Sequence, residues 1–329
     1  MGYKLAPVIA DAADKSGQPT DPLRFDEDDL LEREASYGRS GFALQFMLDV
    51  SLSDADKYPL KLNDFIVMSG CSSWNQAPVN VQWASGKEQL DGCKQLPNIG
   101  LKGDYWCNPM TISQETAEWD GAVMSIDPAG RGKDECAYAV VKMMKGMLYL
   151  TECGGTQDGY NEKSLAALTE VAKRQNVNKI IVESNFGDGM FTQLLKPVLT
   201  KVHPVSIEEV RHSIQKEKRI IDTLEPILNQ HRLVVDDKVI TEDYNNENAL
   251  KYKLFYQLTR LTRDRGSLIH DDRLDAFSIA VAYWVETMDR DIEQAVSDHK
   301  NELLEEELDR FMQASIGRKR REENWINLK

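Results

Sequence analysis

The sequence predicts an α/β protein with a mixed sheet flanked by helices, and two observations carry this prediction. Three strand-like apolar runs follow one another between residues 122 and 153, with a two-residue break between the second and the third. From residue 161 onward, segments with helical spacing alternate with short apolar runs. Strands joined by a tight turn pair antiparallel, whereas strands separated by helices usually pair parallel, so one sheet would contain both kinds of pairing.

The first three strands open this sheet. AVMSID (122–127) is a short apolar run followed by proline. Lys145-Gly146 separates AYAVVKMM (137–144) from MLYLTEC (147–153), which predicts a hairpin with a tight turn. The elements predicted next are a helix over 161–175, a buried strand over 179–184, a helix over 188–199, a strand over 203–210 and a helix over 216–230.

Two more helices are predicted towards the end of the sequence. Apolar residues recur every three or four positions, which is typical of a helix with one buried face, at Leu274, Phe277, Val281, Trp284 or Val285, and Met288. After Asp289 the composition becomes highly charged. A second apolar stripe predicts an amphipathic helix in this charged tail, at Leu303, Leu304, Leu308, Phe311 and Met312.

The region before residue 120 has weaker signals. It contains strand-like pieces at 64–68 and 79–83, and its acidic stretch could hold a short helix within 26–48. We therefore predict three parts, which are a linking or accessory region (1–119), an α/β domain (120–288) and a charged helical tail (289–329).

The composition argues against a membrane protein and against a protein that coats DNA indiscriminately. The 329-residue chain is 41% hydrophobic, and no stretch approaches the roughly 18 uninterrupted apolar residues of a membrane span. The N-terminus lacks the apolar region of a secretory signal, so we expect a soluble intracellular protein. The net charge of −14 opposes tight coating of DNA, but local patches decide phosphate contact, so an enzyme acting on DNA stays open.

The five cysteines are predicted to be free thiols. They form no C-x-x-C pair, which zinc sites usually contain, and a disulfide framework favours short secreted chains. Cys71, Cys93 and Cys107 share one irregular segment, so a metal or disulfide role for these three stays open.

Carboxylates gather at the ends of the predicted elements. Asp127 and Glu183 each end a buried-type strand, and Asp271, Asp272 and Asp275 open the apolar helix. Strand ends converge on one side of a sheet, and residues three or four apart share one side of a helix. Grouped carboxylates repel one another and normally need a cation, for which Mg²⁺ or Mn²⁺ is suited. Two such ions about 4 Å apart can support phosphodiester cleavage.

Each acid also has a simpler explanation. An Asp after a strand often forms a turn, Asp271 or Asp272 could cap the helix, and Glu183 could pair with a lysine. These explanations account poorly for Asp275, which lies inside an otherwise apolar helix. The joint pattern therefore favours a metal site.

The acids lie in three longer segments, SIDPAGRGKDECAYAVV, IIVESNFGDG and HDDRLDAFSIAVAYW. These segments closely resemble the nuclease half of the large terminase subunit of tailed bacteriophages, in particular the DNA-maturation protein of short-tailed phages. The resemblance implies a ribonuclease-H-like fold akin to that of Holliday-junction resolvases. It also implies that Asp127, Glu183 and the HDDRLD acids bind Mg²⁺ or Mn²⁺. The choice between Asp271 and Asp272 stays open, although the resolvase-type D-x-x-D spacing favours Asp272 with Asp275.

The same resemblance implies a biological setting. It predicts double-stranded DNA as substrate, the capsid portal protein and the small terminase subunit as partners, and the host cell cytoplasm as location. The large subunit of this family begins with a packaging ATPase, but the chain has no G-x-x-x-x-G-K-[ST] motif, and the string at 128–134 only imitates one. The chain therefore resembles a C-terminal part without the motor.

Two basic clusters are candidate DNA contacts. The first comprises Lys216, Lys218 and Arg219, for which a solvated helix face with pairs such as Lys218–Asp222 is an equally good explanation. The second comprises Arg260, Arg263 and Arg265 and directly precedes the acidic helix start, so we favour it.

The function predicted from these features is a metal-dependent endonuclease that cleaves concatemeric double-stranded DNA during genome packaging. Asp127, Glu183, Asp272 and Asp275 would be its catalytic residues. Two alternatives are a noncatalytic module that docks on the portal or capsid and a resolvase-like nuclease for branched DNA.

Overall fold

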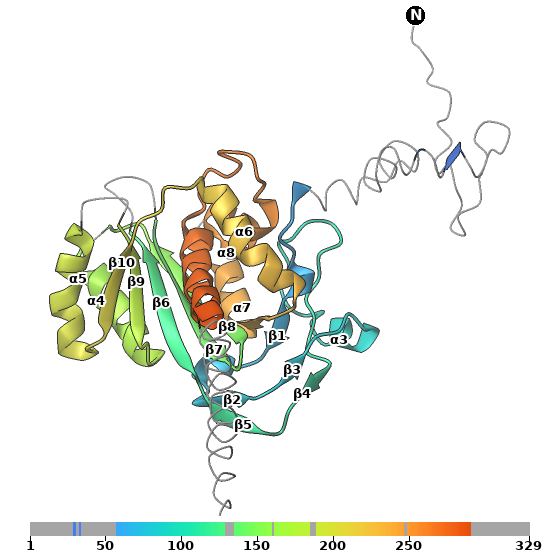
Figure 1. Cartoon of the computed structure of the whole chain (residues 1–329), viewed down its shortest axis with the longest axis horizontal. Helices are drawn as coiled ribbons and strands as arrows, with labels where there is room; N and C mark the ends of the chain where they lie inside the picture. The colour runs from blue at the N-terminus through green and yellow to red at the C-terminus, as the bar shows by residue number, and fades with distance from the viewer. Residues whose placement is uncertain are drawn as a thin grey trace, which may run out of the picture. The chain divides into compact units, whose positions relative to one another are not determined.

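A seven-stranded mixed sheet organises the protein, as seen in a computed structural model (Figure 1). The structure describes residues 29, 30, 33, 57–128, 135–159, 161–184, 189–246 and 249–290. The chain divides into two compact units, Met1–Val281 and Ala282–Lys329. The sheet lies in the first unit, in the order β1-β11-β8-β7-β6-β9-β10.

The strands of the main sheet are β1 (Ile66–Met68), β6 (Gly121–Asp127), β7 (Cys136–Met144), β8 (Met147–Thr156), β9 (Lys179–Glu183), β10 (Ser206–Val210) and β11 (Leu233–Asp236). The helices are α4 (Glu162–Arg174), α5 (Met190–Val202), α6 (Lys216–Asn229), α7 (Asp237–Asn245), α8 (Leu254–Arg260) and a last described helix at 272–290. Shorter elements are α3 (Lys87–Asp91), β2 (Gln76–Pro78), β3 (Val81–Gln82), β4 (Thr111–Ile112), β5 (Thr116–Glu118), η1 (Leu62–Asp64), η2 (Cys71–Ser73) and η3 (Leu250–Tyr252).

Both kinds of strand pairing occur in the sheet, as predicted. β6, β7 and β8 pair antiparallel, whereas β9 pairs parallel with β6 and β10, and β11 pairs parallel with β8 and β1. The predicted turn between β7 and β8 has φ of 48° at Lys145 and 84° at Gly146. Two successive positive φ angles match the twist of a tight hairpin, which explains why glycine follows lysine here.

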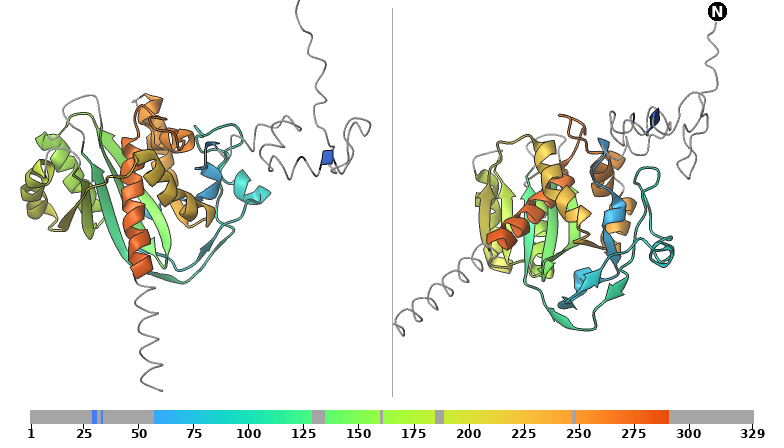
Figure 2. Two further views of the ribbon diagram at one scale, coloured as in Figure 1. Left: turned by 45° about the horizontal axis from the view of Figure 1, so that its top comes forward. Right: turned by 45° about the vertical axis from the view of Figure 1, so that its right-hand side comes forward.

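Helices cover both faces of the sheet, as two further views show (Figure 2). On one face, Met124 and Ile126 of β6 are buried against Leu168 of α4 and Leu195 of α5. Ser125 points the other way, and its hydroxyl donates to the carbonyl of Ala276 in the last described helix. Alternation along β6 therefore serves two layers of helices.

The sheet begins earlier in the chain than residue 120. β1 lies within the segment predicted to be a linking region, yet it pairs with β11 and is fully buried. This part of the segment completes the sheet edge. The predicted division at residues 119 and 288 stays a prediction, and most of the predicted 26–48 helix and of the charged tail lies outside the described residues.

All five cysteines are free thiols, as predicted. Four of them are buried and Cys153 is half-buried. Burial raises the pKa of Cys93 to about 11, so this thiol is held in its unreactive protonated form.

Within the part of the chain that the structure describes, no helix has both the length and the apolar character needed to cross a bilayer.

Candidate metal-binding site

Two carboxylates end neighbouring strands of the main sheet. β6 and β9 are parallel, with Ile126 opposite Val182, so both strands run towards the same edge. Asp127 and Glu183 are the next residues, and each is the last of its strand. Residues at matching positions of parallel neighbours point to the same face, so the two side chains meet.

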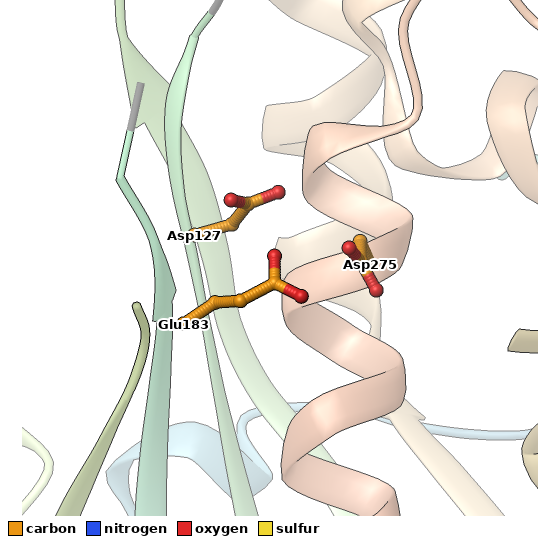
Figure 3. Close-up of side chains that lie close together, drawn as sticks. All are labelled: Asp127, Glu183 and Asp275. Carbon is orange, nitrogen blue, oxygen red and sulfur yellow. The ribbon is translucent and has the colours of Figure 1, made fainter. Parts of the chain in front are cut away.

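The third carboxylate comes from the last described helix. The bond from Ser125 to the Ala276 carbonyl fixes the start of this helix against β6. Asp275 is fully buried there, and Figure 3 shows its carboxylate facing those of Asp127 and Glu183. One oxygen from each of the three residues lies within 4.8 Å of the others. The fold thus gathers three acids, called the acidic cluster below.

Two basic side chains of α6 neutralise part of the acidic cluster. Lys216 Nζ lies 3.4 Å from Asp127 Oδ2 and 3.0 Å from Asp275 Oδ2. Arg219 Nη2 donates to Asp275 Oδ1 at 2.7 Å and to Glu183 Oε1 at 3.3 Å. They are one helical turn apart, so one face of α6 presents both charges to the acids.

Burial and charge shift the pKa values of these groups in different directions. Burial raises the pKa of Asp127 well above its usual value, against the opposing charge of Lys216. Burial likewise raises the pKa of Asp275, which Lys216 and Arg219 oppose. For Glu183, burial is outweighed by the hydrogen bond with His212 and the charge of Arg219, so its pKa is lowered. Carboxylates with unlike affinities for protons therefore share one site.

The acidic cluster fits a hard divalent cation. All its ligand atoms are carboxylate oxygens, which Mg²⁺ and Mn²⁺ prefer. Asp275 Oδ2 is buried and accepts no well-oriented hydrogen bond, although Lys216 Nζ is near it. A carboxylate oxygen has more than one lone pair, so this atom could bind a divalent cation in addition to its contact with the Lys216 ammonium. Among the described residues this is the single cluster of metal-ligand type.

Asp271 and Asp272 lie beside the acidic cluster and face different partners. Asp271 Oδ1 lies 2.8 Å from Lys216 Nζ, the ammonium that also contacts the cluster. Asp272 Oδ2 accepts from the backbone N–H of Glu135 at 3.5 Å and lies 4.0 Å from His270 Nδ1. The Asp272 carboxylate thus points towards the residue before β7, whereas the Asp271 carboxylate contacts Lys216, the lysine that also contacts the acidic cluster.

The predicted DNA-contact residues differ in what their side chains contact. Lys216 and Arg219 face the acidic cluster. Arg263 forms ion pairs with Asp222 at 2.7 Å and Glu225 at 2.6 Å, both on α6. These contacts hold the 261–266 turn against α6. They occupy the Arg263 guanidinium, which was predicted to contact phosphate.

The other three residues differ in exposure. Arg260 donates to the Ile99 carbonyl at 2.8 Å and lies 4.2 Å from the centre of the Tyr256 ring. Lys218 and Arg265 are exposed. The exposed pair therefore offers positive charge to solvent, whereas Arg260 is held by the protein.

Two features of the site have no clear signal in the sequence. His212, just after β10, has Nδ1 3.2 Å from Glu183 Oε1 and 2.9 Å from Arg219 Nη1. One nitrogen cannot donate to the carboxylate and accept from the guanidinium together, so the two contacts require different tautomers. Its position at the end of a strand parallel to β9 is the one clue that the sequence offered.

The second feature is a buried charge network beside Asp272. Arg273 makes a bidentate pair with Glu135, at 2.8 and 2.7 Å, and a third bond to Asp243 Oδ1 at 3.1 Å. All three residues are buried. Because Glu135 precedes β7 and Asp243 belongs to α7, Arg273 ties the start of the last described helix to two other elements.

Comparison with known proteins places this arrangement in a family. Residues 126–233 match the family model described as Terminase Bacteriophage T7, Ribonuclease H-like domain. The chain therefore contains a terminase-type ribonuclease H-like domain. The predicted mixed sheet with flanking helices has this fold, and the resemblance to large terminase subunits is confirmed.

One curated relative extends the match beyond the ribonuclease H-like domain. The chain is 44% identical over 319 residues to the protein called Terminase, large subunit, of Enterobacteria phage T3. The match covers 94% of this chain and 54% of the relative, so the chain spans about half the length of that terminase subunit.

Solved structures of terminase nucleases share a more distant likeness. The human cytomegalovirus terminase nuclease domain, in a manganese-soaked, inhibitor-bound crystal, has a TM-score of 0.38 at 13% identity over 49% of this chain and 81% of that one. The large terminase nuclease of thermophilic phage G20c has a TM-score of 0.36 at 10% identity over 67% and 95%.

Proposed function

We propose that the chain is a divalent-metal-dependent endonuclease, the nuclease part of a terminase large subunit, that cleaves concatemeric double-stranded DNA during genome packaging. The observation that supports this proposal is the acidic cluster, in which Asp127, Glu183 and Asp275 come within 4.8 Å. The terminase family match gives the setting in which such a cluster would cut DNA.

Asp127, Glu183 and Asp275 would hold Mg²⁺ or Mn²⁺, with two ions as the proposed number. A shell of this kind has room for a further acid, Asp271 or Asp272. When bound, such ions supply water activation and stabilise the leaving oxygen of a phosphodiester.

The protein's own side chains prepare the site in two ways. Arg219 donates to both Glu183 and Asp275, which fixes the orientation of two proposed ligands. Lys216 places an ammonium among Asp127, Asp271 and Asp275, which reduces the repulsion between these acids. Both roles are positional, since neither side chain needs to form a bond with substrate.

The wider proposals follow from the family. Double-stranded DNA is the proposed substrate, the capsid portal protein and the small terminase subunit are the proposed partners, and the host cell cytoplasm is the proposed location. The relative from phage T3 is longer than this chain, so these proposals concern a larger protein of which the nuclease is one part.

Plasmid cleavage tests the proposal directly. The wild-type chain should nick plasmid DNA with Mg²⁺ or Mn²⁺ and lose this activity in excess EDTA. Asp127→Asn should be inactive, whereas Glu170→Gln, which changes an exposed acid of α4 on the other face of the sheet, should cut like wild type. Undiminished cutting in EDTA would refute metal dependence. A folded chain that never cuts would instead favour the docking module, and a strong preference for four-way junctions the resolvase.

A further inference from the structure

A large polar pocket lies at the end of β6 that is remote from the acidic cluster. Its volume is about 1030 Å³, and Gly121 and Ala122 at the start of β6 line it. Asp127 ends the same strand. A seven-residue strand spans about 20 Å, so the pocket and the acidic cluster are separate sites. The volume is at the upper end of the range for small-molecule sites.

Lys142 of β7 lines this pocket and has no carboxylate partner. The side chain is only 5% exposed, and no acid in the described ranges lies within ion-pair distance of its Nζ. Glu152, whose charge acts on Lys142, is already bonded to Arg174 at 2.5 Å and to Gln175 at 2.9 Å. Burial lowers the pKa of Lys142 because the ammonium has no carboxylate partner among the described residues, and an anion bound beside it would stabilise the charged form.

The ring of Trp119 lies beside this lysine. Lys142 Nζ lies 5.3 Å from the centre of the Trp119 ring. The Trp119 indole N–H donates to the Trp74 carbonyl at 2.9 Å, which fixes one ring of the pocket relative to the other wall. Trp74 and Trp119 both line the pocket and are half-buried, so part of each indole is accessible. Accessible indole faces stack on planar heterocycles.

A second polar group without a hydrogen-bond partner belongs to a residue that lines the pocket. Gln175 lines the pocket, is 4% exposed, and its Oε1 accepts no hydrogen bond. Its Nε2 donates to Glu152, so Oε1 is the atom that remains to accept a hydrogen bond from a ligand. Buried polar atoms without partners are rare, and one beside an unpaired lysine marks a place where a bound molecule would supply both partners.

We propose that this pocket binds a nucleoside phosphate. The phosphate would pair with Lys142, the base would stack on Trp119 or Trp74, and a sugar hydroxyl or base N–H would donate to Gln175 Oε1. A simple inorganic anion would use the lysine alone and leave the rings and the glutamine oxygen unused. The nucleotide could be free or could end a DNA strand, and this proposal does not depend on the nuclease activity.

Calorimetric titration of the full chain in EDTA tests the site while keeping metal ions away from the acidic cluster. The probes are dAMP, deoxyadenosine, inorganic phosphate and a short 5′-phosphorylated oligonucleotide. We expect dAMP to bind at least tenfold more tightly than deoxyadenosine or phosphate. Tighter binding of the oligonucleotide would assign the site to a DNA end, and tighter binding of dAMP to a free nucleotide.

Three variants decide the outcome. Lys142→Met should weaken dAMP at least tenfold while leaving the melting temperature of the ligand-free protein unchanged or higher, because an unpaired buried charge is removed. Trp74→Ala, at a half-buried position, should also weaken dAMP. Lys201→Met, which changes an exposed lysine of α5, should bind like wild type. The proposal is overturned if wild type shows no dAMP binding at millimolar concentration, or if Lys142→Met and Trp74→Ala both retain wild-type affinity. An unfolded Lys142→Met leaves Trp74→Ala to decide.

Discussion

Two buried acids, one half-buried acid and two bases set the electrostatics of the acidic cluster at the scale of single residues. Lys216 and Arg219 supply fewer positive charges than Asp127, Glu183 and Asp275 supply negative ones. Burial raises the pKa of Asp127 and Asp275, and repulsion from the neighbouring acids adds to this rise. A divalent cation bound here would remove the imbalance, since it brings the positive charge that the side chains lack.

Asp127→Asn separates a ligand from a structural acid. The change removes repulsion from Asp275 and Glu183 but also weakens the pairing of Lys216, so the two effects should nearly cancel. We expect a melting temperature within about 3 °C of wild type, equivalent to about 1 kcal/mol, together with loss of Mn²⁺ binding in calorimetry. A fall of many degrees would mark Asp127 as a structural residue.

Asp271 and Asp272 can be ranked by the same measurement. Asp271 contacts the lysine that serves the acidic cluster, whereas Asp272 accepts from the Glu135 backbone. The geometry therefore predicts that Asp271→Asn weakens Mn²⁺ binding more than Asp272→Asn does, contrary to the D-x-x-D spacing. A larger loss in Asp272→Asn would restore Asp272 as the ligand that completes the shell.

The elements differ in how far the sequence could predict them, and the reason is physical. The last described helix and α4 have long, regular apolar stripes, so their pattern alone identifies them. β11 is only LVVD (233–236), and its place between β8 and β1 depends on partners far away in the chain. Whether so short a segment forms a strand depends on the strands it pairs with, so the sequence pattern alone does not predict β11.

The candidate site shows the same limit. The three acids could be anticipated because each sits at the end of a strand or start of a helix. The partners of Lys216 and Arg219 could not, because which face of α6 meets the sheet is set by packing and not by spacing along the helix. Basic residues near a helix start give the same sequence pattern whether their side chains contact a phosphate or a carboxylate.

The buried network of Arg273 joins three elements, and its loss should be costly. Besides Glu135 and Asp243, it indirectly supports α8, because Asp243 accepts from the backbone N–H groups of Leu254 and Phe255 at the start of that helix. Arg273→Met would leave two buried acids without their cation. Breaking such a pair costs about 3–5 kcal/mol.

Thermal unfolding measures this effect against a matched control. Arg273→Met should lower the melting temperature by about 10 °C, given about 2–4 °C per kcal/mol for a domain of this size. Arg263→Met breaks a pair with two acids that is half exposed, so it should cost only about 0–1 kcal/mol. Equal losses in the two variants would show that burial of the Arg273 network contributes nothing special.

The basic residues of α6 and the turn at 261–266 make distinct predictions for DNA binding. Lys218 and Arg265 are exposed, whereas Arg263 is paired with Asp222 and Glu225. Lys218→Ala with Arg265→Ala should therefore lower the slope of log affinity against log salt by about 2, as each lost phosphate contact contributes about 0.9. Binding measured from about 50 to 200 mM salt gives this slope.

Arg263→Ala serves as the comparison within the same turn. Its guanidinium is committed to α6, so the variant should leave the salt slope nearly unchanged. A flatter slope in Arg263→Ala than in the Lys218 and Arg265 double variant would reverse the assignment and make Arg263 the phosphate contact.

On the scale of the whole molecule, β6 connects two sites of opposite character. Its last residue carries an acid that suits cations, and its first residues line a pocket whose buried lysine suits anions. Between them the strand is buried on both faces, in the centre of the sheet. A rigid central strand keeps the two sites apart, so a variant at one end should leave the other intact.

Metal binding should stabilise the whole first unit, because the three proposed ligands come from β6, β9 and the last described helix. A ligand that binds only the folded state at a hundredfold excess over Kd adds about 2.7 kcal/mol, which corresponds to about 5–10 °C in melting temperature. We expect Mn²⁺ to produce such a shift in wild type and in Glu170→Gln, and EDTA to reverse it. Asp127→Asn should show little shift, because one of the three cluster carboxylates is lost. If Mn²⁺ raised the melting temperature of Asp127→Asn as much as that of wild type, or if NaCl at equal ionic strength had the same effect as Mn²⁺, the stabilising ion would bind elsewhere and the acidic cluster would not be its site.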